Sequence, residues 1–107
     1  MNETDSELIR ICAETCLGCD GVSRMTSRYD TKDYLKEIAG LESGEKGVRM
    51  TKEKGMLIFD LYVKVRYGEN IPVLAWNIQH LVTEALKEKT DDKIKEVNIH
   101  VQGVDLE

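Results

Sequence analysis

The chain has 107 residues, 41% of them hydrophobic and 33% charged, with a net charge of −5. This length suits one domain with a single modest core, and no apolar run approaches the ~18 residues of a membrane span. The negative charge disfavours a nucleic-acid partner, because phosphate contacts need clustered Lys and Arg side chains. An acidic, polar N-terminus predicts a cytoplasmic protein, and an odd number of cysteines disfavours a disulfide framework.

The first predicted element is a helix over residues 5–18. The segment from Thr4 to Glu7 has the pattern of a capping box, and Gly18 marks the end of the helix. Side chains at helical spacing form one stripe with Cys16 at its edge. The stripe consists of Leu8, Ile11, Cys12, Thr15 and Cys19.

The next part of the chain gives weaker signals. Residues 21–25 alternate in polarity and predict a short edge strand. Residues 26–47 predict a glycine-interrupted connection with one or two helical turns, which carry Tyr34, Leu35 and Ile38 inward.

Two strands are then expected over residues 47–52 and 55–67, joined by a hairpin turn over residues 52–55. Alternation divides the second strand into two faces. The inward face carries Leu57, Phe59, Leu61, Val63, Val65 and Tyr67, and the other face carries Asp60, Tyr62, Lys64 and Arg66. We expect the polar face to be solvated.

A second long helix is predicted to begin after Asn70, its N-cap, with Pro72 in the first turn, and to run to about Lys89. Its apolar stripe comprises Ile71, Leu74, Ile78, Leu81, Val82 and Ala85. A last strand over residues 93–102 turns apolar side chains inward and polar ones outward. The inward residues are Val97, Ile99 and Val101, and the outward residues are Glu96, Asn98, His100 and Gln102.

These elements follow the order α-β-β-β-α-β. Because each strand has one polar face, helices should cover only one side of the sheet. The strand-helix-strand crossover predicts that the last two strands are parallel. We therefore expect a single α+β domain over residues 1–107, built as a two-layer sandwich with a mixed sheet and helices on one face.

The three cysteines lie in CAETCLGC, residues 12–19, with the C-x3-C-x2-C spacing of radical S-adenosylmethionine enzymes. Those enzymes are barrels of about twice this length, and a cluster or zinc ion normally needs a fourth ligand. The C-x-x-C pair lies near a helix C-terminus, where the dipole opposes a thiolate. We favour packing of Cys12, Cys16 and Cys19 as small apolar side chains and expect no cofactor. A metal- or redox-responsive protein that uses these thiols is the alternative hypothesis.

The outer side of the second long helix is the first candidate surface for binding a partner. Trp76 points about 160° away from the apolar stripe of its helix, at about 100° per residue, with Val73 and His80 on the same side. Exposed Trp is typical of interface hot spots. We therefore expect these three residues to contact another protein. The alternative is that the 26–47 connection folds over Trp76.

The second candidate surface is the polar sheet face around Tyr62 and His100. It has too few aromatic side chains for an RNA-binding sheet. His100 could pair there with Asp60 or Glu96. The sequence contains no catalytic triad spacing, paired catalytic carboxylates or phosphate-binding loop, so no catalytic residue is predicted.

Three segments of the second half carry a resemblance to a known family. They are DLYVKVRYGENIP (60–72), NIQ (77–79) and KEVNIHVQGV (95–104). They resemble the alkaline shock protein family of Gram-positive bacteria, in which a strand ends in Tyr-Gly, a turn leads into Ile-Pro and a long helix, and the last strand ends in Val-Gln-Gly-Val. Cys12 and Cys16 fall on small positions of that family's first helix. The 26–47 connection and Asp91-Asp92, which replaces a glycine, depart from the pattern.

The resemblance implies a role in cell-envelope homeostasis and stress response. Some members self-assemble, and some associate with the membrane through a separate membrane-anchored protein. No catalytic residues are established for the family. We therefore expect a non-enzymatic interaction or scaffold protein that self-associates, binds no nucleic acid and is held at the inner face of the membrane by a partner.

Overall fold

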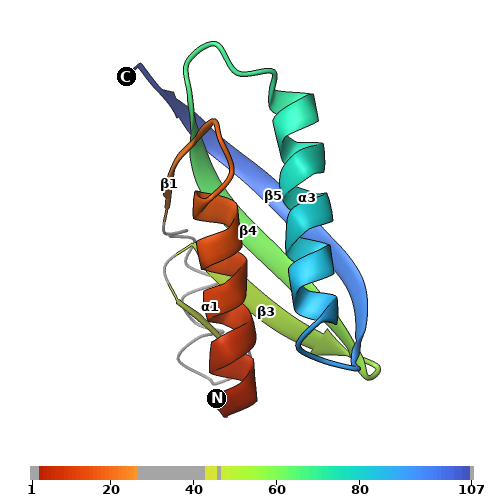
Figure 1. Cartoon of the computed structure of the whole chain (residues 1–107). Coiled ribbons are helices and arrows are strands. Elements are labelled where there is room, and N and C mark those ends of the chain that lie inside the picture. Colours follow the sequence, from red (N-terminus) through yellow and green to blue (C-terminus); the bar gives the residue numbers. More distant parts are fainter. Residues whose placement is uncertain (1–2, 27–42, 46, 107) are drawn as a thin grey trace.

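A computed structural model describes residues 3–26, 43–45 and 47–106. Its elements are α1 (Glu3–Leu17), β1 (Val22–Met25), β2 (Ser43–Glu45), β3 (Val48–Glu53), β4 (Met56–Arg66), α3 (Ile71–Lys87) and β5 (Lys93–Asp105). The predicted α+β order is confirmed, with β2 as an additional short strand (Figure 1). The helical turns predicted around Tyr34, Leu35 and Ile38 lie outside the described residues.

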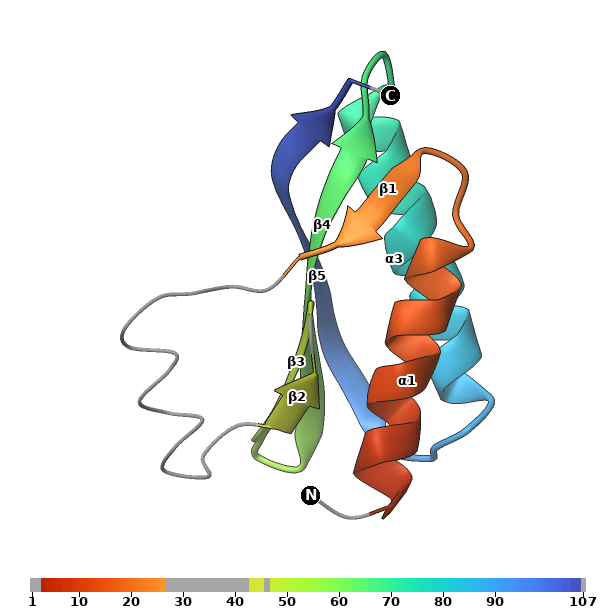
Figure 2. The same cartoon turned by 90° about the vertical axis from the view of Figure 1, so that its left-hand side faces the viewer.

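β4 is the central strand of a mixed five-stranded sheet. Along one side it pairs in parallel with β5, from Met56↔Lys93 to Arg66↔Asp105, which confirms the predicted crossover. Along its other side it pairs antiparallel with β3 and then with β1. β2 adds to the far side of β3, so β1, β3 and β2 all lie on the side of β4 away from β5 (Figure 2).

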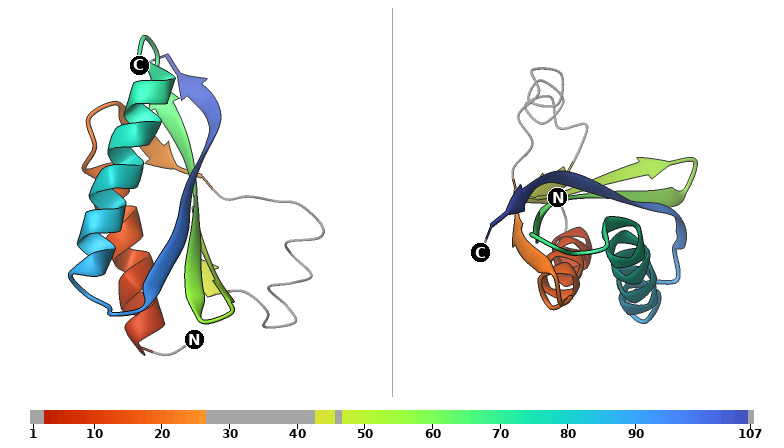
Figure 3. Two further views of the ribbon diagram at one scale, coloured as in Figure 1. Left: turned by 90° about the vertical axis from the view of Figure 1, so that its right-hand side faces the viewer. Right: turned by 90° about the horizontal axis from the view of Figure 1, so that it is seen from above.

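Helices α1 and α3 pack together on one face of this sheet, as predicted, and the core lies between the two layers (Figure 3). The central core side chains of β4 are Leu57, Phe59, Leu61, Val63 and Val65, each no more than 2% exposed. They meet Leu8, Ile9, Cys12 and Cys16 from α1 and Leu74, Ile78, Val82 and Leu86 from α3. The two-layer sandwich is therefore held mainly by apolar burial between one long strand and two amphipathic helices.

The β3–β4 hairpin closes through a tight turn over residues 53–56, one residue later than the predicted turn over 52–55. Glu53 pairs with Met56, so only Lys54 and Gly55 form the loop. Their φ angles are 51° and 78°, both in the left-handed region. This is the type I′ geometry that matches the twist of the flanking strands, and glycine adopts its second position without strain.

The N-cap of α3 is the residue that the sequence predicts, but the buried stripe of this helix differs from the prediction at two residues. Asn70 accepts a hydrogen bond from the backbone N–H of Val73 at 3.2 Å, which confirms it as the N-cap. The buried side chains are spaced by four residues, from Leu74 to Leu86. Ile71 and Leu81 are 38% and 48% exposed, so the prediction that they belong to the buried stripe is wrong. They lie at the margins of the face that contacts the sheet.

Three further details differ from the sequence-based expectations. α1 already begins at Glu3, so Thr4 lies within its first turn and does not cap it. Cys16 is fully buried at the centre of the helix stripe, where the prediction placed it at the edge. Tyr67 is 73% exposed because β4 ends at Arg66 and the chain then turns away at Gly68, which has a φ of 92°.

Candidate functional site

The outer helix surface, formed by Val73, Trp76 and His80 on α3, lies where the helical periodicity predicted it. Trp76 is 62% exposed and Val73 is 54% exposed, although both have large apolar surfaces. The Trp76 and His80 rings stack almost in parallel, with centroids 5.3 Å apart and planes 3° apart. Because the buried stripe of α3 faces the sheet and α1, these three side chains point away from the core.

A pocket of about 310 Å³ adjoins the outer helix surface, between α3 and the end of α1. The loop from Gly18 to Asp20 forms one wall, and Leu74, Asn77, His80 and Leu81 form the other. His80 belongs to both the pocket and the stacked pair. An exposed aromatic ring therefore lies beside a hollow whose lining includes Leu74 and Leu81, an arrangement suited to holding a side chain of another protein.

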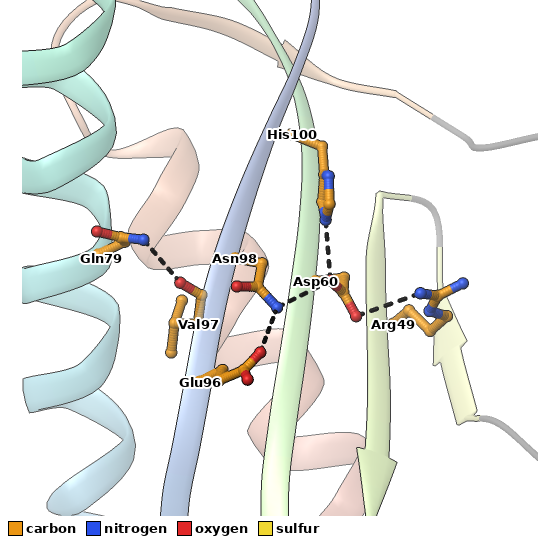
Figure 4. Close-up of polar contacts among 7 residues, drawn as sticks. All are labelled: Arg49, Asp60, Gln79, Glu96, Val97, Asn98 and His100. Atoms are coloured by element: carbon orange, nitrogen blue, oxygen red, sulfur yellow. Dashed lines mark hydrogen bonds and ion pairs between the residues drawn. The ribbon is translucent and has the colours of Figure 1, made fainter.

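The outer sheet face, formed by Asp60, Tyr62, Asn98 and His100, lies on the opposite side of the molecule. Asp60 Oδ1 accepts a hydrogen bond from Asn98 Nδ2 at 3.2 Å and lies 2.9 Å from His100 Nε2. Its Oδ2 lies 3.4 Å from Nη2 of Arg49 on β3 (Figure 4). One carboxylate thus links three strands through polar side chains.

The prediction that this face is solvated is wrong for two of its residues. Asp60 and Tyr62 are only 6% and 4% exposed. The Tyr62 ring stacks on His100, with centroids 4.6 Å apart and planes at 14°. The parallel register of β4 and β5 places Tyr62 opposite His100 and Asp60 opposite Asn98, which brings these pairs together. Of the two residues proposed to bind a partner here, His100 presents the larger exposed area.

Replacement of Asp60 by alanine should lower the free energy of unfolding by about 1–3 kcal/mol, because it leaves the Arg49, Asn98 and His100 donors without their shared acceptor. Urea denaturation followed by circular dichroism measures this loss. The exposed carboxylate Asp91 provides the matched control, for which Asp91→Ala should change stability by no more than about 0.5 kcal/mol. Equal effects of the two substitutions would show that the hydrogen bonds of Asp60 do not stabilise the fold.

The cysteine motif, the third candidate site, lies in the core. Cys12, Cys16 and Cys19 are free thiols and all buried. Burial raises the pKa of Cys12 from 9.0 to about 12, with a smaller contribution from Cys16. Burial likewise raises the pKa of Cys16 to about 12, with a contribution from Cys19. Such thiols resist forming the thiolate that metal binding and thiol exchange require.

The surroundings of these thiols do not suit a metal ion either. Within residues 3–26, 43–45 and 47–106, no group of three or more His, Cys, Asp or Glu side chains is placed to hold one. The Cys19 thiol instead donates to the backbone oxygen of Thr15 at 3.4 Å. The structure therefore gives no support to the metal-site alternative and is consistent with core packing.

The sequence matches the alkaline shock protein 23 family, which is described as having a cell envelope-related function, over residues 3–106. The chain belongs to this family. The predicted resemblance to alkaline shock proteins is thereby confirmed. The match also spans α1 and the 26–47 segment, where the residues alone gave a looser correspondence or none.

Relatives of this alkaline shock family member occur in Gram-positive bacteria. The chain is 32% identical over 103 residues to the uncharacterised protein YloU of Bacillus subtilis (strain 168), covering 95% of this chain and 86% of YloU. It is 40% identical over 86 residues to the uncharacterised protein Spy1535 of Streptococcus pyogenes serotype M6, covering 79% of this chain and 63% of that protein. It is 30% identical over 88 residues to the uncharacterised protein YqhY of Bacillus subtilis (strain 168), covering 82% and 64% of the two chains. It thus spans less than two thirds of the last two relatives. No solved structure matches the chain.

Neither described helix of this alkaline shock family member has the length and apolar character needed to cross a membrane. Helical periodicity located the outer helix surface but gave no sign of the pocket beside it, because the pocket depends on how the end of α1 meets α3. Asp60 was one of two expected partners for His100. The bonds of Asp60 to Arg49 and Asn98 were not predictable, since cross-strand register sets them.

Proposed function

We propose that this chain is a non-enzymatic interaction protein in cell-envelope homeostasis or stress response. It self-associates, and a membrane-anchored partner protein recruits it to the envelope through the outer helix surface. Membership of the alkaline shock protein family supports the cell-envelope role at the coarse level. The exposed, stacked Trp76 on α3 is the single observation that carries the interaction role.

The stacking of Trp76 on His80 supports a role in recognition. A large side chain held in one orientation loses less conformational entropy when a partner binds it. Val73, which is also exposed and apolar, extends the contact area one turn before Trp76, and Leu81 adds an exposed apolar side chain in the adjoining pocket. Trp residues that anchor interfaces commonly cost about 2 kcal/mol or more when truncated, so this position can dominate the affinity.

The reactive side chains of the described structure support a role without catalysis. The Asp60 carboxylate and His100 are bonded to each other and to strand neighbours, which gives them structural partners. The thiols of Cys12 and Cys16 are buried and have raised pKa values. The pocket beside α3 is lined by one histidine and one carboxylate on separate elements, together with Leu74 and Leu81. These environments favour structure and contact over chemistry.

Trp76→Ala should reduce capture of the membrane-anchored partner by about 30-fold or more, the equivalent of losing a hot spot of about 2 kcal/mol. The measurement is a quantitative pull-down from detergent-solubilised membranes, followed by a titration with the purified partner. Because Trp76 is the single tryptophan of the chain, its emission also reports contact directly. The emission should shift to shorter wavelength when the partner covers the ring.

The matched control is Tyr67→Ala, which removes a 73% exposed aromatic ring outside the outer helix surface. This variant should retain capture at the wild-type level. Equal capture by the two variants, or an emission maximum that does not move on binding, would contradict the proposed role of Trp76.

A further inference from the structure

β5 has one side that no described strand covers. It is 13 residues long, and within the described part of the chain its only strand neighbour is β4. Figures 1 and 3 show it along the margin of the sheet, beside α3. An edge of this length presents a row of backbone donors and acceptors that can pair with another strand.

A hydrogen bond identifies which residues face this edge. Gln79 of α3 donates its Nε2 to the backbone oxygen of Val97 at 2.9 Å, on the side of β5 away from β4 (Figure 4). In a strand the N–H and C=O of one residue point to the same side and alternate along the chain. Ile99 and Val101 therefore also direct their backbone groups to the open edge. The Val97 oxygen has a second lone pair, so the bond from Gln79 leaves it able to accept another.

Two β-bulges determine which partner fits this edge. Lys95 is an extra residue between the pairs Leu57↔Ile94 and Ile58↔Glu96. Gln102 is likewise extra between Val63↔Val101 and Lys64↔Gly103. Each bulge shifts the alternation of side chains by one residue. Beyond either bulge, the inward side chains of a regular partner strand would therefore no longer lie opposite the inward side chains of β5. A partner strand with bulges at the corresponding places would keep inward side chains opposite one another.

We propose that the open edge of β5 pairs antiparallel with β5 of a second copy, in a register centred on Ile99. The strand then overlaps itself over all 13 residues, and each bulge lies one position from the bulge of the other copy. The apolar inward residues meet one another, and Lys93 meets Asp105 at both ends. The Asp105 carboxylate also bonds Ser23 and Arg24 of its own chain, so Lys93 joins an existing charge network. The pairs are Lys93 with Asp105, Ile94 with Val104, Val97 with Val101, Asn98 with His100, and Ile99 with Ile99.

This interface deepens the self-association part of the proposed function, on which it rests. Directly opposed residues of an antiparallel pair share a face, so the two sheets join with their helix-covered faces on the same side. Both α3 helices then flank the seam on one face. The Trp76 rings point away from their own sheets, so each copy keeps a surface for the membrane-anchored partner.

Cysteine cross-linking tests the register. Ile99→Cys places two thiols directly opposite each other, within the roughly 4.4–6.8 Å Cα separation that a disulfide needs. Mild oxidation should link this variant into covalent dimers about tenfold faster than Gln102→Cys. In the Gln102→Cys dimer the two introduced thiols lie about 20 Å apart along the paired strands, too far to form a disulfide. A mixture of Asn98→Cys and His100→Cys should link as heterodimers faster than either variant alone. The wild-type protein, whose three cysteines are buried, measures the background.

Charge reversal tests the same interface without a new thiol. Lys93→Glu places glutamate opposite Asp105 at both ends and should weaken dimerisation about tenfold in analytical ultracentrifugation, an effect that high salt reduces. Lys87→Glu on α3, with the same change of charge, should leave dimerisation unchanged. A concentration-dependent dimer that neither links through Ile99→Cys nor weakens with Lys93→Glu would overturn the β5 assignment and leave self-association standing. A wild-type protein that stays monomeric at all concentrations would overturn both, while capture through Trp76 would remain a separate result.

Discussion

Phe59→Ala should lower the free energy of unfolding by about 3–5 kcal/mol, a large part of the roughly 5–15 kcal/mol typical of a domain. Phe59 is the largest fully buried side chain among the residues that the structure describes, and it lies in the middle of β4, in the core that both helices cover. Its removal leaves a cavity, because strands bonded on both sides of β4 cannot close around it. Urea denaturation at fixed pH measures the change from the transition midpoint and slope.

Trp76→Ala is the informative comparison for Phe59→Ala. Both substitutions remove a large aromatic ring, but Trp76 is 62% exposed, so its loss should change the free energy of unfolding by about 0.5 kcal/mol or less. A loss of several kcal/mol at Trp76 would show that its ring stabilises the fold. That outcome would remove the reason for assigning it to partner binding.

The strands and helices with strong periodicity were predictable because local rules and tertiary packing agree there. Asn70 and Pro72 mark the start of α3, and the alternation of β4 correctly placed Leu57 to Val65 inward. One of the errors occurred where an element ends. Tyr67 continues the alternation in the sequence, but pairing with β1 and β3 stops before it, so its side chain leaves the core.

The candidate site was predictable to the extent that one helix determines it. The direction of Trp76, Val73 and His80 follows from 3.6-residue periodicity alone. The contacts of Asp60 with Asn98 and of Tyr62 with His100 do not follow from it, because they require the register of β5 against β4. The bulges at Lys95 and Gln102 also have no signal in the pattern of the strand. Because the sequence does not reveal these bulges, it also gives no indication of which strand can pair with the open edge of β5.

Raising the pH above about 9 should destabilise the protein through its buried thiols. The pKa of both Cys12 and Cys16 is raised to about 12 by burial, from 9.0 for an unburied thiol. Below pH 9 the folded and unfolded states both hold these protons, so the stability they contribute is complete. Between 9 and about 12 only the unfolded state releases them, and stability falls as pH rises. Each thiol contributes a slope of at most about 1.4 kcal/mol per pH unit, so the pair contributes at most about 2.7.

Urea denaturation from pH 7 to about pH 10.5 measures this slope, and the Cys12→Ala/Cys16→Ala double variant removes it. Tyrosine and lysine titrate in both proteins, so the difference between the two curves isolates the thiols. The variant should lose stability at pH 7, because two small cavities form in the core, yet depend less on pH above 9. A metal site predicts the opposite behaviour, because metal-bound thiolates have lowered pKa values. A chelator would then destabilise the wild-type protein but not the double variant. Parallel pH curves for the two proteins would contradict the raised pKa values and reopen the motif as a site of chemistry.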